Sequence, residues 1–247
     1  MLQNIRIKCE KNYINIFLYI IQMLSLLYPT YFILKTLISS TISAFYICKW
    51  AKKPFFNPEK YSHDYLLEKF NIINNVGKYV VLNYNIIYFG FSRHFLHEES
   101  LDIHVRIFQN IKFLFYLELL AYIYHRLSHE IPYLYKNSHA IHHRNIEVYP
   151  VDFLEFDWID NIAQTLYINL PLVIVPMNMN DYAIIYYLYA TGAFLIHSDI
   201  FTKEHVIHHR KFKYNYCLLI PIFDHLFFTY YYPETVEILE NQENSTT

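Results

Sequence analysis

The sequence predicts an all-α, integral-membrane helical bundle, and three observations support this fold class. Apolar residues make up 54% of the 247 residues and charged residues 17%, which is fewer charges than a water-facing surface usually carries. The apolar residues are concentrated in stretches long enough for membrane helices. Lysine and arginine residues flank these stretches, as expected for a protein oriented in a bilayer.

The longest apolar stretch, residues 14–48, contains one charge, Lys35. A helix needs about 20 residues to cross a hydrocarbon core of ~30 Å. The stretch is therefore either one kinked helix or a hairpin that turns near Pro29 and Thr30. We favour the hairpin because basic residues flank both ends, which is easiest to satisfy if both ends face the cytosol.

Four shorter stretches complete the predicted bundle. Residues 75–91 are the weaker and residues 107–124 the stronger candidate for a pair of spans, with a loop between them on the far side of the membrane. Residues 161–177 and 181–196 would each be about 25 Å long as helices, slightly less than a full span. They are expected to form a thin hairpin or to dip into the bilayer, and either way the chain returns to the side it left.

Charge and glycine content exclude several functions. A net charge of −2 gives no basic face for nucleic acid. Phosphate-binding loops and nucleophile elbows need clustered glycines, whereas the chain has only Gly77, Gly90 and Gly192. The three cysteines are odd in number and lack metal-site spacing, which argues against a disulfide framework.

Nine of the fourteen histidines form an ordered set. Two HxxHH motifs occur, in HAIHHR at 139–144 and HVIHHR at 205–210, and HRLSH precedes them. On a helix, positions i, i+3 and i+4 share one face, so each HxxHH motif would direct three imidazoles to one place. One such motif would arise by chance in roughly one chain in twenty of this composition, and two far less often. We therefore expect a metal site formed by His125, His129, His139, His142, His143, His197, His205, His208 and His209.

The predicted topology places this set on one side of the membrane. All nine histidines follow the span at 107–124, and an even number of crossings separates residues 150 and 197. The basic residues among them make that side cytosolic. His94, His97 and His104 fall in the loop on the opposite side and are not expected to be ligands. His63 and His225 lie on the same side as the site but are isolated in the sequence, so a surface or packing role is expected for them.

The ligand type limits the choice of metal. Imidazole suits iron, zinc and copper, whereas magnesium and calcium prefer oxygen ligands. Nine histidines exceed the about four to six ligands that one ion takes, so two metal ions are expected. His129 and Glu130 are not followed by the second histidine of an HExxH zinc-protease motif. The favoured site is a histidine-rich dinuclear, oxygen-activating centre in a cytosolic helical cap on the bundle.

The ordered histidine motifs resemble those of the integral-membrane fatty acid hydroxylase and sterol desaturase superfamily, which carries HxxxH, HxxHH and a later HxxHH after membrane spans. The resemblance covers about residues 107–230. It includes the lone His197 before the last motif, and an ending in which Asn215, Asp224 and Thr229 stand in the expected places.

The resemblance implies two iron ions, which zinc can replace in preparations, and removal of hydrogen from a C–H bond of a lipid with oxygen and two electrons. Hydroxylation and desaturation stay open, as do sterol and fatty acyl substrates, with sterols slightly favoured. No fused haem or nucleotide site is visible in the sequence. The electrons are therefore expected from a separate b-type cytochrome or NAD(P)H reductase.

Three polar residues are expected near the ligands or behind them: Asp157, Asn215 and Asp224. Many sterol-acting members carry a stretch like FHPxE, and here FDWID puts Asp157 in the place of that histidine and Asp160 in the place of the glutamate. Asp157 is either an additional carboxylate close to the metals or a residue that starts a helix.

These expectations divide the chain into an N-terminal membrane-spanning region at 1–106, a catalytic domain at 107–232 and a polar tail at 233–247. The protein is expected in the endoplasmic reticulum membrane with the metal site facing the cytosol, so the sequon at Asn244 should carry no glycan. Two other functions stay open: a membrane zinc hydrolase that uses metal-bound hydroxide, and an inactive membrane scaffold of the same fold.

Overall fold

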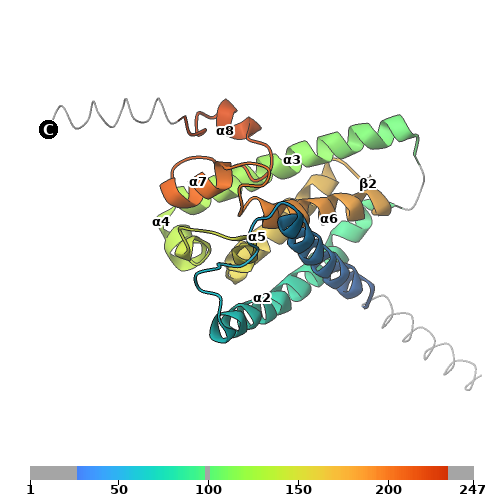
Figure 1. The fold of residues 1–247 in the computed structure, drawn as a ribbon. Helices are drawn as coiled ribbons and strands as arrows, with labels where there is room; N and C mark the ends of the chain where they lie inside the picture. The colour runs from blue at the N-terminus through green and yellow to red at the C-terminus, as the bar shows by residue number, and fades with distance from the viewer. Residues whose placement is uncertain (1–26, 98–100, 233–247) are drawn as a thin grey trace, which may run out of the picture.

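The computed structural model describes residues 27–97 and 101–232, and most of these residues are helical (Figure 1). The long helices are Leu27–Trp50, α2 (His63–Gly90), α3 (Ile103–Glu130), α5 (Trp158–Asn169) and α6 (Met179–Leu195). The prediction of a mainly helical fold is confirmed. The sequon at Asn244 lies outside the described residues.

Short elements connect the long helices. The short helices are α4 (Pro132–Leu134), α7 (Glu204–Lys211) and α8 (Ile222–Leu226). The π-helical turn η2 is Tyr135–His139, and the 3₁₀ turns are η1 (Ser92–His94), η3 (His142–Arg144), η4 (Pro150–Leu154) and η5 (Leu170–Val173). Two short strands, β1 (Leu96–His97) and β2 (Met177–Asn178), pair in parallel. Leu96 lies opposite Met177.

Polar side chains determine where the long helices begin. The first backbone N–H groups of a helix have no partner within it, and a Ser, Asp or Asn side chain just before the helix can accept from them. Ser62 accepts from the N–H of Tyr65 at 3.2 Å to start α2. Asp102 accepts from the N–H of His104 at 2.8 Å to start α3.

Helices α3 and α6 run in the same direction, which positions the histidines. Their N-terminal ends are joined by Arg106, whose guanidinium donates to both oxygens of Asp181 at 2.8 and 2.6 Å. A paired guanidinium and carboxylate fix distance and orientation together. Because both helices run away from this ion pair, their C-terminal ends bring the HRLSH motif and His197 to the same end of the molecule (Figure 1).

A buried cluster of charges connects α2 to the segment after the first HxxHH motif. Lys69 of α2 is 5% exposed and donates to Asp152 at 2.6 Å and to Glu155. Arg144 donates to the other oxygen of Glu155 at 2.8 Å. Two cations therefore balance two carboxylates that are removed from water, and the cluster fixes η3 and η4 against α2.

One helix among the described residues, Leu27–Trp50, is long and apolar enough to cross a membrane. The turn expected near Pro29 and Thr30 is wrong, because both residues lie within this helix. A turn there would expose backbone groups in an apolar stretch, whereas a helix keeps them hydrogen-bonded. The part of the stretch before Leu27 lies outside the described residues.

The other predicted spans coincide with helices but do not reach the same apolarity and length. Helix α3 carries charges along its length, α6 has 17 residues and α5 has 12. A helix of 17 residues is about 25 Å long. The membrane-spanning bundle therefore stays a prediction for these helices.

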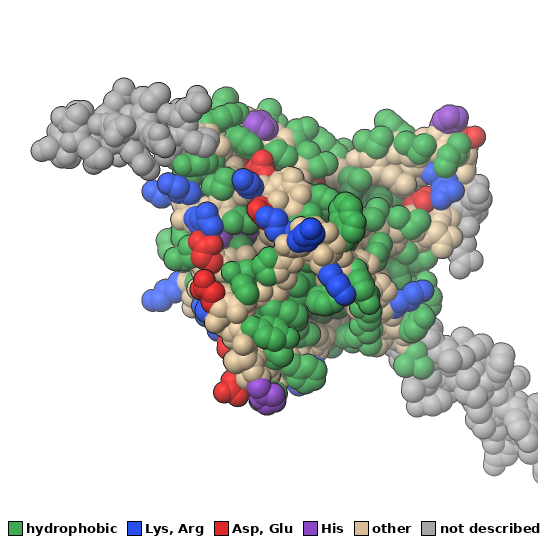
Figure 2. Space-filling view, in the orientation of Figure 1, with side chains coloured by type: hydrophobic (Ala, Val, Ile, Leu, Met, Phe, Trp, Pro, Cys, Tyr) green, Lys and Arg blue, Asp and Glu red, His purple; other side chains and the backbone are tan. Residues whose placement is uncertain are grey.

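Exposed side chains are of two kinds. Large apolar side chains are exposed along Leu27–Trp50, α2 and the first half of α3, where Ile103, Ile107, Ile111 and Phe115 recur every four residues. Lys and Arg side chains gather over α4 and α7, beside the histidine-bearing elements (Figure 2). An apolar band of this extent is typical of a surface that faces lipid or a partner.

We predict that Lys69→Met destabilises the protein by about 3–5 kcal/mol, because Asp152 and Glu155 would lose their buried cation. Thermal or denaturant unfolding of the purified protein in detergent measures this change. Lys78→Met on the same helix is the control, because Lys78 is exposed and its loss should change stability by less than about 0.5 kcal/mol. Equal effects of the two substitutions would contradict the assignment.

Candidate metal centre

Four helical elements and the turn after α6 carry the nine histidines of the ordered set. His125 and His129 lie in the last turns of α3, and His139 ends the π-helical turn η2. His142 and His143 lie in the 3₁₀ turn η3, His197 follows α6, and α7 carries His205, His208 and His209. The expected α-helix for an HxxHH motif is therefore found for 205–209 and not for 139–143. The first motif lies between Pro132 and Pro150, and its turns are short.

The structure brings all nine imidazoles into two adjacent groups. One group holds His125, His129, His139, His143 and His208, and the other holds His142, His197, His205 and His209. Within each group, the nearest ring nitrogens all lie within 4.8 Å of one another. Each HxxHH motif contributes its first and last histidines to one group and its middle histidine to the other.

His208 lies at the centre of the first group. Its Nε2 is 3.0 Å from Nε2 of His129 and 3.1 Å from Nε2 of His143. Its Nδ1 donates to the carbonyl of Tyr214 at 2.7 Å. A neutral imidazole carries one N–H, so the Nε2 of His208 presents a lone pair to the other two rings.

His197 has the same place in the second group. Its Nδ1 donates to the carbonyl of Ala193 at 2.9 Å, which leaves a lone pair on Nε2. That Nε2 is 3.3 Å from Nε2 of His142 and 3.3 Å from Nε2 of His205. The middle positions of both groups are thus occupied by rings whose outer nitrogen is held by a backbone carbonyl.

These separations fit metal coordination. Two metal–nitrogen bonds of about 2.0–2.1 Å place their nitrogens about 3.0–3.4 Å apart at coordination angles of about 90–110°. In the first group, the buried Nε2 atoms of His125 and His139 also have no hydrogen-bond partner within the part of the chain that the structure describes. The donor set of each group therefore fits one ion, and ligation itself stays a prediction.

Burial keeps the rings uncharged. It lowers the pKa of His197 to about 4 and of His129 to about 2. Loss of water is the largest cause, and for most of the rings repulsion between neighbouring imidazolium charges adds to it. The pKa is lowered in the same way for His125, His142, His143, His205, His208 and His209. At neutral pH these rings offer lone pairs, as metal ligands must.

Asp224 and Asn215 shape the loop that faces the cluster and do not themselves face the ring nitrogens. Asp224 accepts from the N–H groups of Tyr216 and Cys217, both at 2.8 Å. The carbonyl of Tyr216 in turn accepts from Nδ1 of His125 at 2.7 Å. Asn215 adopts a left-handed backbone conformation (φ 60°), and its side chain donates to the carbonyl of Glu204 at 3.1 Å, next to His205.

Asp157 starts α5, and Asp160 contacts a histidine. The side chain of Asp157 accepts from the N–H groups of Ile159 and Asp160, which is the helix-start role. Asp160 lies one turn further, 2% exposed, and both its oxygens are 3.4 Å from Nδ1 of His139. Tyr124 also donates to Asp160. The carboxylate next to the cluster is therefore Asp160, whose place was visible in the FDWID stretch.

Five histidines lie outside both groups in the described parts of the chain: His63, His94, His97, His104 and His225. His63 is exposed beside Asp64, and His225 stacks on Tyr230. The arginine after each HxxHH motif pairs with a carboxylate of this chain, Arg144 with Glu155 and Arg210 with Glu147 at 2.7 Å. The sequence offered no signal for these pairs.

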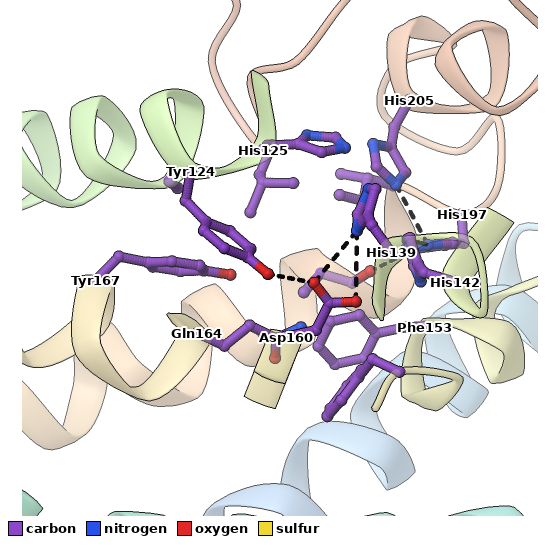
Figure 3. A pocket seen from close by; sticks show the side chains of 15 residues that line it. Tyr124, His125, His139, His142, Phe153, Asp160, Gln164, Tyr167, His197 and His205 are labelled. Atoms are coloured by element: carbon purple, nitrogen blue, oxygen red, sulfur yellow. Dashed lines mark hydrogen bonds and ion pairs between the residues drawn. The ribbon is translucent and has the colours of Figure 1, made fainter. Parts of the chain in front are cut away.

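A small pocket opens beside the histidines (Figure 3). Tyr124 and His125 of α3 face Asp160, Gln164 and Tyr167 of α5 across it, and His205 reaches it from α7. Apolar side chains close the remaining sides, among them Phe153, Phe156 and Leu218. The pocket therefore combines metal-ligand chemistry with walls that suit an apolar molecule.

Comparison with known proteins identifies the region that contains the cluster. Residues 111–229 match the fatty acid hydroxylase family. This match begins in α3 and ends after α8, and it includes all nine histidines. The match covers just under half of the chain, and it supports the similarity to the fatty acid hydroxylase and sterol desaturase superfamily.

Similar curated proteins come from plants and yeast. The chain is 31% identical over 115 residues to a Delta(7)-sterol-C5(6)-desaturase of Nicotiana tabacum, and this alignment covers 42% of each of the two chains. It is 25% identical over 137 residues to the Delta(7)-sterol 5(6)-desaturase of Saccharomyces cerevisiae, covering 52% of this chain and 37% of that protein. Protein CER1-like 1 of Arabidopsis thaliana is 26% identical over 139 residues, covering 46% and 22%. The matches thus span about two fifths of the sterol desaturases, and no solved structure matches the chain.

We predict that Asp160→Ala weakens metal binding by roughly 10–100-fold, because the carboxylate orients His139 and holds the proton on its outer nitrogen. Asp160→Asn should recover part of the affinity, since an amide oxygen can still accept from that nitrogen. Competition with a chromophoric chelator measures the affinity. Asp64→Ala, at an exposed site on α2, is the control, and an unchanged affinity in Asp160→Ala would refute the role.

We also predict that the metal-free protein becomes less stable as the pH falls below about 6.5, the ordinary pKa of histidine. The unfolded chain then binds protons that the buried rings do not accept, so each ring costs up to about 1.4 kcal/mol per pH unit. Thermal unfolding between about pH 7.5 and 5.5 measures this loss, which His63→Ala should leave unchanged because His63 is exposed. A constant midpoint would show that the rings are not buried in neutral form.

Proposed function

We propose that this chain binds two iron ions at the nine histidines and oxidises a C–H bond of a membrane lipid with oxygen. The observation that carries this proposal is the pairing of two all-imidazole groups, five and four rings, beside a pocket with apolar walls. Imidazole ligands suit iron, and non-haem iron held by protein side chains can activate oxygen. The names of the similar sterol desaturases support a sterol substrate, with fatty acyl lipids as the second choice.

The overall reaction consumes one oxygen molecule and two electrons. Hydroxylation converts RH, O₂, two electrons and two protons into ROH and water. Desaturation removes two hydrogens from adjacent carbons and yields an alkene and two waters. Bound iron would supply the oxygen activation and the oxidising power, which no side chain of this chain can provide.

The residues of the chain position the metals and exclude water. The carbonyls of Tyr214, Tyr216 and Ala193 hold three histidine rings by their outer nitrogens. Asp160 orients His139, and it accepts a hydrogen bond from Tyr124 at the pocket wall. Apolar side chains around the pocket limit the access of water, which protects a reactive centre from side reactions.

A membrane location accounts for the exposed apolar band. Leu27–Trp50 provides one candidate span. In the first half of α3, exposed apolar side chains occur at every fourth position. We infer that residues 1–106 anchor the protein and that residues 107–232 form the catalytic domain, in the endoplasmic reticulum with the cluster facing the cytosol.

Electrons would come from a b-type cytochrome or an NAD(P)H reductase. Exposed lysines on the histidine-bearing side suit a partner with an acidic surface: Lys136, Lys203, Lys211 and Lys213. Arg144 and Arg210 are less available to such a partner, because each already pairs with a carboxylate of this chain.

A zinc hydrolase is the second candidate, since zinc also accepts imidazole ligands. Metal analysis of anaerobically purified protein, together with activity in the absence of oxygen, separates the two enzymes. Two irons and oxygen-dependent turnover support the lipid oxidase, whereas zinc with turnover under nitrogen supports the hydrolase.

We predict that expression of this chain in a yeast that lacks its own sterol desaturase produces a new unsaturated or hydroxylated lipid. Mass spectrometry of the extracted sterols and fatty acids identifies the product and the substrate. His208→Ala and His142→Ala, one from each group, should abolish the product. His208→Ala removes the ring whose Nε2 faces the Nε2 atoms of His129 and His143, and His142→Ala removes a ring whose Nε2 faces that of His197.

His63→Ala is the matched control for these variants, because His63 is exposed and lies outside both groups. It should leave the amount of the new lipid unchanged. A new lipid that persists in His208→Ala would contradict a metal centre. An unaltered lipid profile with correctly inserted, iron-loaded protein and a functioning donor would support the scaffold instead.

A further inference from the structure

A large apolar groove lies between the helix Leu27–Trp50 and α2, away from the histidines. It encloses about 770 Å³. The first helix contributes Leu34, Leu37, Ile38 and Ile42, and α2 contributes Phe70, Ile73, Val76 and Val80. Of these side chains, Leu34, Ile38, Ile42, Phe70 and Ile73 are exposed at the surface. Because one wall is the candidate membrane span, the groove would open towards the hydrocarbon of the bilayer.

A middle hollow lies between this groove and the histidine pocket and shares lining residues with both. It shares Leu37, Val80 and Leu154 with the groove. It shares five other residues with the histidine pocket: Phe153, Phe156, Gln164, Tyr167 and Ala193. The three spaces therefore lie next to one another in the fold. They run from the groove at the surface, through the middle hollow, to the pocket lined by His125, His139 and His205.

The three spaces differ in size. The middle hollow and the histidine pocket measure about 40 Å³ each, whereas the groove falls within the roughly 300–1,000 Å³ of pockets that hold compact ligands. The body of a fused-ring lipid fits the volume of the groove. Movement of the aromatic side chains between the spaces, Phe153 and Phe156, would let part of it advance to the histidines.

We propose that a sterol enters from the side, out of the bilayer, through the groove between Leu27–Trp50 and α2, and reaches the histidines past Leu37, Val80 and Phe153. The proposal rests on the proposed function, because it assumes that the reacting carbon meets the metal centre. The apolar lining, the position beside the candidate span and the shared walls all favour a membrane lipid over a water-soluble molecule. The groove is then both the waiting place and the size filter for the substrate.

Two glycines of α2 provide a matched pair of test sites. Gly77 lines the groove and Gly90, the last residue of α2, does not. A Cβ atom added at either position meets no other atom within 4 Å, so a cysteine fits at both. The native Cys48 and Cys217 are buried and should react slowly. Comparing the wild-type chain with and without the reagent is the control for modification of any other thiol.

The first experiment treats Gly77→Cys and Gly90→Cys with a bulky methanethiosulfonate reagent in vesicles that contain sterol. Modification should remove most of the sterol turnover of Gly77→Cys, and a reductant that releases the reagent should restore it. The same treatment should leave Gly90→Cys as active as before. Comparing each variant with itself before and after modification removes any effect of the substitution on folding.

The second experiment needs no turnover. The rate of thiol modification is measured in detergent, without oxygen, while a 3-hydroxysterol or a fatty acyl lipid is added. Sterol should slow modification of Gly77→Cys several-fold and leave Gly90→Cys unaffected. Protection by the acyl lipid alone would overturn the sterol assignment.

The outcomes separate the two proposals. Sterol protection at position 77 without turnover in any variant supports the groove and counts against the proposed oxidase. Full turnover of modified Gly77→Cys, with the oxidase active, overturns the route and leaves the proposed function standing. Equal protection at positions 77 and 90 would also overturn the route.

Discussion

Nine imidazoles share one region of this protein, and burial keeps eight of them uncharged by lowering their pKa. Each protonated ring would repel its neighbours and lose its hydration, which is why the pKa of His129 and of His197 falls far below its ordinary value. Neutral rings leave lone pairs that face one another at 3.0–3.3 Å. A bound metal ion would relieve that crowding, so the same constraint that burdens the metal-free fold would favour a metal-bound protein.

The surrounding structure keeps four of the rings in the tautomer that this arrangement needs. Backbone carbonyls do this for His125, His197 and His208, and a carboxylate does it for His139. The carbonyl of Tyr216 is itself held in place, since Asp224 accepts from the N–H groups of Tyr216 and Cys217. The cluster thus depends on residues that never approach a ring nitrogen, and their hydrogen bonds extend its geometry into α5, α8 and the loop between α7 and α8.

The N-terminal half packs against the segment that follows part of this centre in the chain. The buried pairing of Lys69 with Asp152 and Glu155 fixes α2 against the segment that follows the first HxxHH motif. The groove between the first helix and α2 includes Leu154, in that same segment, among its lining residues. A lipid route and a ligand-bearing turn therefore share one short stretch of backbone, which would connect substrate entry to the position of His142 and His143.

The sequence by itself determined the mainly helical fold, the candidate ligand set and the resemblance to the superfamily, because apolar runs and histidine spacing are local properties of the chain. It also marked Asp157 and Asp160 as candidate carboxylates near the site. The role of Asp157 stayed open, since the sequence alone does not separate a helix-capping aspartate from one that lies beside a metal. Only the tertiary structure decided that the middle histidine of each HxxHH motif joins the opposite group. It also decided that Pro29 lies within a helix, and that Asp224 acts through the backbone of Tyr216. These features depend on which ends of α3, α6 and α7 meet, and that meeting is set by long-range contacts such as Arg106 with Asp181, which no local spacing encodes.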